Sequence, residues 1–239
     1  MPNAAEIVTI TLKGPGKNAL STALLEQLEA ELAAHAGAPL LLVGDAGCFS
    51  AGLDLTEVMR LEADEMASFL RLLERVCARL HDHAGPVVAA VNGHAIAGGA
   101  VLAACCDHRV GGVDPKARIG LNEVALGLRF PPGILRILQA RLPAPQHGAL
   151  LLGAGLHAPT EALRLGLLDE LADDPVAVAE ARLRALAAHP PAAFAATKAA
   201  LRAGVTEARP GEAEAFIAEV VPVWTSGALR ARLRAVLRR

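Results

Sequence analysis

The chain has 239 residues, of which 53% are hydrophobic, 20% charged and 3% aromatic, and its formal net charge is −2. This length and composition predict one sizeable globular domain, or a core with an appendage, and argue against disorder. The near-zero charge excludes a general electrostatic attraction to DNA or anionic lipid, and the few aromatic residues argue against a stacking surface for single-stranded nucleic acid.

The sequence shows no pattern typical of a secretion signal, a membrane span or a cysteine-based redox or metal site. The first residues do not combine a basic segment with an apolar core, and no apolar run reaches the roughly 18 residues of a membrane span. Four cysteines, Cys48, Cys77, Cys105 and Cys106, show no CxxC spacing, and the adjacent Cys105 and Cys106 are expected to be small buried residues, not a disulfide or a metal site. We therefore expect a soluble cytoplasmic protein with no membrane partner and no metal.

The first half of the chain alternates strand and helix patterns. Apolar runs or period-two alternation predict strands over 6–12, 39–44, 86–93 and 107–112. Apolar residues at helical spacing predict helices over 21–36, 55–83 and 97–107, and Ser21 or Thr22 is the expected cap of the first. This alternation predicts an α/β core that extends to about residue 135.

The second half is mostly helical, with one strand pattern at 166–171. The predicted helices cover 133–142, 145–152, 160–165, 175–188, 192–203 and 211 to the end. We find no fixed-period repeat and no flexible linker, so this part is expected to be a helical appendage and not a tethered second domain.

Two strand-to-helix turns are built from residues with little side chain, "FSAGLD" (49–54) and "NGHAIAGGAVLA" (92–103). Amides at a helix start have no partner within the helix and, with the helix dipole, attract negative charge. Small side chains allow a ligand oxygen to approach these amides closely. Two such turns could bind one oxygen from two sides, as an oxyanion hole does.

Alternative interpretations of these turns stay open. Small residues also allow a helix and a strand to pack closely, and for either turn alone that interpretation is the more common one. Nucleotide binding is poorly supported, because "KGPGKNAL" lacks the spacing and the hydroxyl of a P-loop and "GHAIAGG" is not GxGxxG.

Glu123 is a candidate acid or base because it lies among apolar residues in "IGLNEVALG" (119–127). A carboxyl group in apolar surroundings has a raised pKa and can transfer protons near neutral pH. The alternative is a surface carboxylate on the polar side of a turn, and spacing does not distinguish the two.

Histidines and arginines offer weaker candidates. His81 and His83 are expected at a helix end without a third metal ligand, and His94 could line a pocket. The final helix carries a set of arginines that is most simply a solvated face, although one or two could meet a phosphate; they are Arg230, Arg232, Arg234, Arg238 and Arg239.

Taken in order, "CFSAGLDLTE", "VNGHAIAGGAVLAACCDHRV", "IGLNEVALG" and "EALRLGLLDEL" resemble the crotonase superfamily, which includes enoyl-CoA hydratases and Δ3,Δ2-enoyl-CoA isomerases. The resemblance extends from about Ile7 to the C-terminus, and the segments "FSAGLDLTE" and "IGLNE" are most similar to the isomerase branch.

The resemblance implies an α/β fold, a spiral of ββα turns in a core over 1–190, followed by a helical region over 191–239 that forms homotrimers or hexamers. The amides of Ala51 and Gly98 would bind the thioester oxygen of an acyl-CoA, and Asn122 and Glu123 would face the acyl chain. Further substrate-binding positions would be Lys17, Ala19, Gly52, Leu53, Asp54, Leu55 and Gly99. No cofactor is expected, because coenzyme A enters as part of the substrate.

The same resemblance favours isomerisation over hydration. Hydratases of this superfamily use a second glutamate three residues after the oxyanion-hole glycine, and in this chain Val101 stands three residues after Gly98. One base suits a proton shuttle from C2 to C4 of a 3-enoyl thioester, and an apolar wall excludes water. Asp54 followed by Glu57 is interpreted as a helix cap and not as the missing acid.

Three alternatives remain at this stage. Arg129 and Phe130 stand where hydratases usually carry small residues, so they could reshape the acyl tunnel and change the reaction. The chain could be a hydratase, or another crotonase-type lyase or hydrolase, with a second acid elsewhere. It could also bind acyl-CoA without turnover, while DNA binding is a distant possibility.

Overall fold

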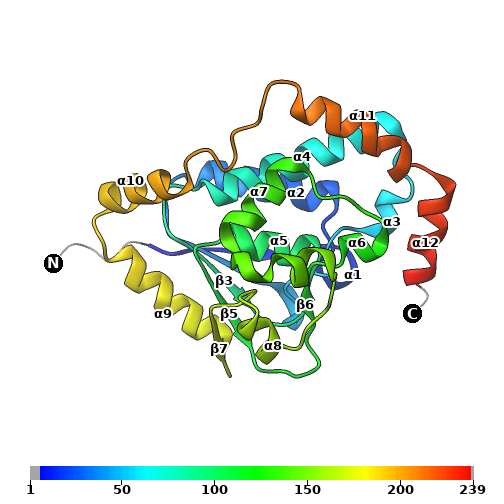
Figure 1. Ribbon diagram of the computed structural model, residues 1–239. Helices are drawn as coiled ribbons and strands as arrows, with labels where there is room; N and C mark the ends of the chain where they lie inside the picture. Colours follow the sequence, from blue (N-terminus) through cyan, green and yellow to red (C-terminus); the bar gives the residue numbers. More distant parts are fainter. Residues whose placement is uncertain (1–5, 238–239) are drawn as a thin grey trace.

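The computed structural model describes residues 6–237 as one unit of parallel strands surrounded by helices (Figure 1). The strands are β1 (Val8–Leu12), β2 (Leu40–Gly44), β3 (Val87–Val91), β4 (Ala95–Ile96), β5 (His108–Gly112), β6 (Ile119–Gly120) and β7 (Glu170–Ala172). The α-helices are α1 (Pro15–Asn18), α2 (Thr22–Ala34), α3 (Leu55–Val58), α4 (Ala63–His81), α5 (Gly98–Cys105), α6 (Glu123–Leu126), α7 (Pro132–Arg141), α8 (Pro159–Arg164), α9 (Pro175–Ala187), α10 (Pro191–Arg202), α11 (Glu212–Trp224) and α12 (Gly227–Leu237).

The main sheet is five-stranded and entirely parallel, in the order β1-β2-β3-β5-β7. A second layer of short pairings lies beside it and consists of the β4-β6 pair and the parallel bridges Leu20↔Leu53 and Ser50↔Ala95. Successive segments of the chain thus add a long strand to one layer, a short pairing to the other, and then a helix. This is the expected α/β spiral of ββα turns.

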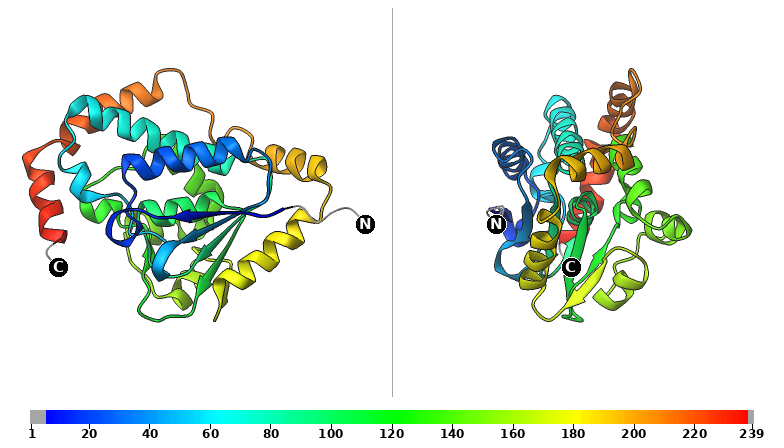
Figure 2. Two further views of the ribbon diagram at one scale, coloured as in Figure 1. Left: turned by 180° about the vertical axis from the view of Figure 1, so that it is seen from behind. Right: turned by 90° about the vertical axis from the view of Figure 1, so that its left-hand side faces the viewer.

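Alternate residues of the central strands face different helices. On β2, Leu40 and Leu42 belong to the large core cluster with α2, α4 and α5, whereas Leu41 and Val43 pack in a smaller cluster with α9. Burial on both faces explains why "LLLV" is continuously apolar. Figure 2 shows the helices around the sheet from two further sides.

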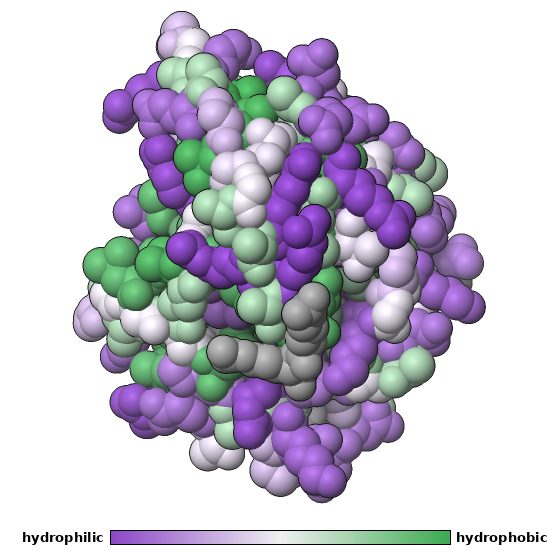
Figure 3. Space-filling model, turned by 90° about the vertical axis from the view of Figure 1, so that its right-hand side faces the viewer, coloured by the Kyte–Doolittle hydropathy of each residue, from purple (hydrophilic) through white to green (hydrophobic). Residues whose placement is uncertain are grey.

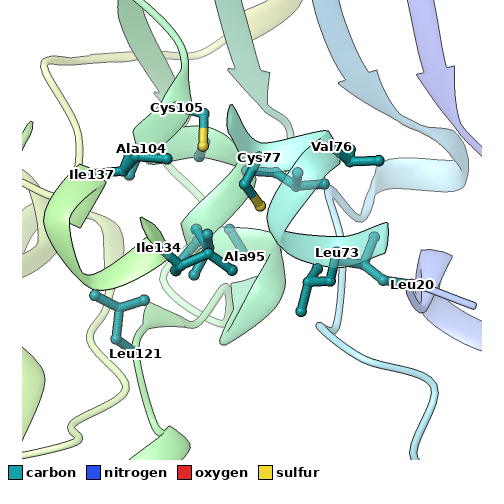
Figure 4. Packing of buried hydrophobic residues seen from close by; sticks show 14 of the residues in the cluster. Leu20, Leu73, Val76, Cys77, Ala95, Ala104, Cys105, Leu121, Ile134 and Ile137 are labelled. Carbon is teal, nitrogen blue, oxygen red and sulfur yellow. The ribbon is translucent and has the colours of Figure 1, made fainter. Parts of the chain in front are cut away.

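The large core cluster is close-packed around α4, α5 and α7. Figure 4 shows Cys77, Cys105 and Ile134 within it, and all of the cysteines are free and buried. The prediction that Cys105 and Cys106 are small buried residues is therefore confirmed.

The predicted helix over 55–83 is two helices in the structure. Asp54 caps α3, because its Oδ1 accepts hydrogen bonds from the amides of Thr56 (2.9 Å) and Glu57 (3.3 Å). A new helix then begins at Glu62, which forms a capping box with Glu65. The interpretation of Asp54 as a cap is confirmed, and the single long helix was wrong because the second cap interrupts it.

The C-terminal helices also differ in detail from the prediction. The helix expected over 145–152 is a 3-10 helix, η2 (Ala144–Gln146), followed by a π-helix, η3 (Gly148–Leu152). The segment from 211 onward is two helices, with the break at Thr225 and Ser226 between α11 and α12. The strand predicted at 166–171 is β7, shifted toward the C-terminus.

The last two helices pack against the chain's own core. Helix α11 contacts α4 and α7, and α12 contacts α11 (Figure 1). The side of the molecule that carries α12 is mostly hydrophilic, with hydrophobic residues in small groups (Figure 3). The division at residue 190 and the assembly into trimers or hexamers remain predictions.

Within residues 6–237, no helix combines the length and the apolar character that crossing a membrane requires. The cytoplasmic location stays a prediction.

Candidate active site

A cavity of about 290 Å³ lies where the two small-residue turns, 49–54 and 92–103, meet the segment that begins with Glu123. The turns contribute Ala51, Leu53 and Gly98 to its wall, and the Glu123 segment contributes Asn122 and Glu123. Residues that are far apart in sequence converge here because α3, α5 and α6 all begin at the same edge of the short-strand layer.

In the first turn, the amides of Phe49 and Leu53 have no acceptor among residues 6–237, and of these two residues only Leu53 lines the cavity. The amide of Ser50 donates to the carbonyl of His94 (2.9 Å), that of Gly52 to Ser50 Oγ (3.2 Å) and that of Asp54 to the carbonyl of Leu20 (3.1 Å). Across the described part of the chain, the Leu53 amide has no hydrogen-bond acceptor. Because Leu53 lines the cavity, its free amide is a candidate donor to a ligand.

The hydrogen-bond partners of this turn also correct the expectation that the Ala51 amide binds the thioester oxygen. This amide donates to the carbonyl of Lys17 at 2.9 Å and is therefore not available to a thioester oxygen. Two residues later, Leu53 lines the cavity, and its amide has no acceptor among residues 6–237. The prediction that the Ala51 amide is a free donor is therefore wrong, and the role of this turn in binding a thioester oxygen remains a prediction.

In the second turn, the Gly98 amide is the first of helix α5 and has no acceptor among residues 6–237. The two turns are in contact, because a Cβ added to Gly52 would lie 2.7 Å from the carbonyl oxygen of Ile96 and 3.3 Å from the nitrogen of Gly98. Gly52 also has a φ of +87°, which glycine adopts readily. Glycine at position 52 thus brings the free amides of Leu53 and Gly98 to one end of the cavity.

Gly99 serves packing. A Cβ at this position would lie 2.5 Å from the carbonyl oxygen of Ser50, so only glycine lets α5 approach the first turn this closely. Gly99 does not line the cavity. For this residue, the packing interpretation of the small-residue turns is the one that the structure supports.

The Lys17 loop lies against the first turn. Asn18 is buried and holds the loop by donating to the carbonyls of Asp45 (3.0 Å) and Cys48 (2.6 Å), while its own carbonyl accepts from Ser50 Oγ (2.8 Å). Lys17 itself is exposed. Neither Lys17 nor Ala19 lines the cavity, so their contact with coenzyme A remains a prediction.

Glu123 is buried, with 8% of its surface exposed, and its Oε2 has no hydrogen-bond partner. Burial in apolar surroundings disfavours the charged carboxylate and raises the pKa of Glu123 to about 8. The buried interpretation of this residue is therefore correct, and the surface interpretation is wrong. A carboxyl group with this pKa can both take up and release a proton near neutrality.

The rest of the wall near Glu123 is apolar, apart from Asn122 and Arg129. Val101 lines the cavity, where a carboxylate would be needed for a second acid. The Oδ1 atom of Asn122 is buried and unpartnered. Of the lining residues that the structure describes, Glu123 is the one carboxylate.

Arg129 and Phe130 both line the cavity, as the sequence suggested. The Arg129 guanidinium is mostly exposed and forms an ion pair with Glu219 (2.7 Å) of α11, 5.6 Å above the ring of Phe216. Arg129 therefore links the Glu123 segment to the C-terminal helices and does not act as a second charge beside the carboxylate.

The histidines have structural contacts. His81 Nδ1 lies 2.8 Å from Asp82 Oδ1, and His83 Nε2 lies 2.8 Å from the carbonyl of Ala38. His94 Nδ1 accepts from the amide of Arg118 (3.0 Å), and His94 does not line the cavity. No cluster of potential metal ligands occurs within the described range 6–237.

Sequence reasoning missed the contribution of the C-terminal helices. Trp224 of α11 and Val236 and Leu237 of α12 line the cavity, so the region expected only to form oligomers covers the chain's own site. Of the arginines in the last helix, Arg230 contacts the carbonyl of Leu61, and Arg238 and Arg239 lie outside the described residues. The one tryptophan in an aromatic-poor sequence was the available signal.

Comparison with known proteins gives a consistent result. A family model described as enoyl-CoA hydratase/isomerase matches residues 3–219. The chain is 33% identical over 187 residues to mitochondrial enoyl-CoA delta isomerase 1 of Mus musculus, in a match that covers 74% of this chain and 63% of the relative. It is also 33% identical over 203 residues to 2,3-dehydroadipyl-CoA hydratase of Escherichia coli strain K12, covering 82% of this chain and 78% of the relative.

Among solved structures, the human mitochondrial delta3-delta2-enoyl-CoA isomerase superposes with a TM-score of 0.88 at 27% sequence identity. The superposition covers 100% of this chain and 95% of that structure. In sequence, by contrast, the match spans less than two thirds of the mouse isomerase.

Proposed function

Because the chain belongs to the enoyl-CoA hydratase/isomerase family, we propose that it is a one-base isomerase that converts a 3-enoyl-CoA into the conjugated 2-enoyl-CoA. The observation that carries this proposal is the Glu123 carboxyl group, which is buried, has no partner for Oε2 and is the one carboxylate among the described residues of the cavity wall.

The proposed reaction begins at C2, next to the thioester carbonyl. The ionised Glu123 removes a proton from C2, and the electron pair moves onto the thioester oxygen to give a dienolate. The amides of Leu53 and Gly98, both unpartnered, would donate to that oxygen. Removal of one such donor from an oxyanion hole typically costs about 2.7–4 kcal/mol of barrier.

The second step returns the same proton at C4. The charge moves back from the oxygen, the double bond forms between C2 and C3, and Glu123 becomes ionised again. A carboxyl group with a pKa of about 8 is suited to both steps, because it binds a proton more tightly than an ordinary glutamate and still releases it near neutral pH. Val101 supports this reaction over hydration, since a valine side chain cannot orient water.

The proposal can be tested with a 3-enoyl-CoA that carries deuterium on both positions of C2. A single shuttling carboxyl group delivers part of the label to C4 of the conjugated product in ordinary water. Two separate groups would place only solvent hydrogen at C4. Product that is conjugated but contains no label at C4 would contradict the one-base mechanism.

A parallel assay distinguishes the hydratase alternative. The purified protein is supplied with 2-enoyl-CoA of the same chain length, and formation of the 3-hydroxy product is followed. We expect isomerisation to be faster than hydration by at least about 100-fold, because the acid–base contribution of a second group is typically 10²–10⁴-fold. Comparable rates would contradict the assignment.

A further inference from the structure

Part of the cavity is lined by apolar side chains, and we call this part the apolar chamber. Its wall includes Leu73 of α4, Leu128, Ile134 of α7 and Trp224 of α11. Leu73 and Ile134 belong to the same core cluster, as Figure 4 shows, so this side of the chamber is fixed by close packing. An apolar wall of this kind binds hydrocarbon and excludes water.

The chamber is closed on another side by the C-terminal helices, which are held in place by arginines. Arg129 pairs with Glu219 of α11, and Arg230 of α12 donates to the carbonyl of Leu61 (2.9 Å) and lies 3.2 Å from Glu62. Leu229 and Leu233 of α12 are also buried, with exposures of 3% and 0%. Helices α11 and α12, which cover this side of the chamber, are therefore packed against the rest of the fold.

Trp224 is the largest side chain in the chamber wall, and only 3% of its surface is exposed. Its position is determined by α11, which packs on α4 and α7, the two helices that carry Leu73 and Ile134. Truncation of the indole, the largest side chain in this wall, would enlarge the space available to an acyl chain more than truncation of any other lining residue.

The volume of the cavity gives the size of the occupant. An apolar cavity of about 150 Å³ binds one benzene molecule, with six carbons, so 290 Å³ accommodates roughly twelve non-hydrogen atoms. The thioester carbon and oxygen occupy the end with the free amides, which leaves room for a chain of medium length. A longer chain would have to pass Val236 and Leu237 at the rim, where their exposed fractions are 38% and 54%.

We infer that Trp224 determines chain-length specificity and that the substrates are medium-chain acyl-CoA thioesters, with about six to ten carbons in the acyl group. This inference rests on the proposed function for the identity of the ligand. It adds a specificity-determining residue, Trp224, in a region that the sequence assigned only to assembly.

The first experiment measures kcat/KM for 3-enoyl-CoA substrates from six to sixteen carbons. We expect a maximum near eight carbons and at least about a tenfold decrease by sixteen, since one methylene that does not fit a pocket costs 10- to 200-fold. In Trp224→Ala the ratio of the sixteen-carbon to the eight-carbon value should rise about tenfold. Trp224→Leu should give a smaller change in the same direction. This variant provides the test if Trp224→Ala does not fold.

Val223→Ala is the matched control, because Val223 precedes Trp224 on α11, is 51% exposed and does not line the cavity. The length profile of this variant should match that of the wild type. Equal use of all chain lengths by the wild type would overturn the inference. So would an unchanged ratio in folded Trp224→Ala or Trp224→Leu.

A binding measurement separates this inference from the proposed reaction. The chain contains one tryptophan and no tyrosine, so its intrinsic emission reports Trp224. Saturated octanoyl-CoA, which cannot isomerise, should shift that emission, and coenzyme A alone should not. A shift without turnover of any enoyl-CoA would contradict the isomerase and leave the chamber assignment intact, whereas turnover without a shift would contradict the chamber assignment.

Discussion

Two carboxyl groups in the interior of this protein have opposite surroundings. Asp107 accepts hydrogen bonds from the amide of Val87, from Lys198 Nζ and from Arg202 Nη2, each at 2.7 Å. Glu123 has no cation beside it and leaves Oε2 without a partner. The carboxylate of Asp107 is stabilised by its three hydrogen-bond donors. The charged form of the Glu123 carboxyl group, by contrast, is destabilised by burial.

The contrast indicates how to separate a structural charge from a functional one. Arg202, one of the two cations beside Asp107, also satisfies helix ends, since it donates to the carbonyl of His81 at the end of α4 and lies 3.4 Å from the carbonyl of Cys105 at the end of α5. Every member of that cluster has a role in holding the fold. An unpaired buried carboxyl group has no such role, and a perturbed group in a cavity is a candidate for catalysis.

The largest expected effect comes from removing the acid–base function of Glu123. Glu123→Gln should lower kcat for 3-enoyl-CoA isomerisation by 10²–10⁴-fold, the usual contribution of a positioned acid or base. The stability to urea at pH 8 should be unchanged or higher, because the amide has no buried charge. A steady-state assay and an unfolding curve measure the two quantities, and a variant with full activity would remove Glu123 from the mechanism.

Asp107 should show the reverse behaviour. Asp107→Ala leaves Lys198 and Arg202 without their carboxylate, and loss of one partner of a buried ion pair costs about 3–5 kcal/mol of unfolding free energy. Activity for each folded molecule should change little. Urea denaturation measures the loss, and exposed Asp173→Ala is the control, with an expected change within about 0.5 kcal/mol. A mild effect at Asp107 would mean that the cluster is not structural.

Moving the oxyanion donors tests the other end of the cavity. Gly52→Ala places a Cβ 2.7 Å from the carbonyl oxygen of Ile96 at a φ of +87°, so the turn must shift and displace the Leu53 amide. We expect a decrease in kcat of about 10- to 100-fold, below the roughly 10²–10³-fold that loss of a whole oxyanion donor costs. Gly37→Ala has a similar φ of +78° and open space around it, so it separates backbone strain from displacement. Equal effects in both variants on kcat would contradict the role of the turn.

A further expected effect, which needs no substitution, is the pH dependence of the wild type. With a pKa of about 8 for Glu123, kcat/KM should rise about tenfold for each pH unit up to that value and then level off, because the ionised carboxylate is the base. A rate that is flat between pH 6 and 8 would contradict the raised pKa.

Stability should change in the opposite direction over the same range. The pKa of Glu123 in the folded state lies above its ordinary value of 4.5, so the folded state holds the proton more tightly than the unfolded state. The stabilising contribution is complete below 4.5 and is lost as the pH rises from 4.5 to about 8. Comparing unfolding free energies of the wild type and Glu123→Gln across this range isolates the contribution of this carboxyl group.

Much of the fold followed from the sequence because the signals were local. The alternating strand and helix patterns up to 112, the cap at Asp54 and the interior cysteines are consequences of side-chain polarity and spacing, which neighbouring residues determine. The break at Glu62 was missed, because the apolar spacing continues across it while the capping box interrupts the backbone. The two small-residue turns and Glu123 were recognisable as candidate site residues because the size and polarity of their sequence neighbours are also local features.

Tertiary structure alone decided which groups can act. Sequence could not distinguish the amide of Ala51, which is bonded to Lys17, from that of Leu53, which is free, because hydrogen-bond partners come from distant segments. Nor could it place Trp224 opposite Glu123, since 101 positions separate them in the chain (224 − 123). The sequence by itself determined the family-like motifs and the core, and the packing of α11 and α12 onto that core determined the shape of the site.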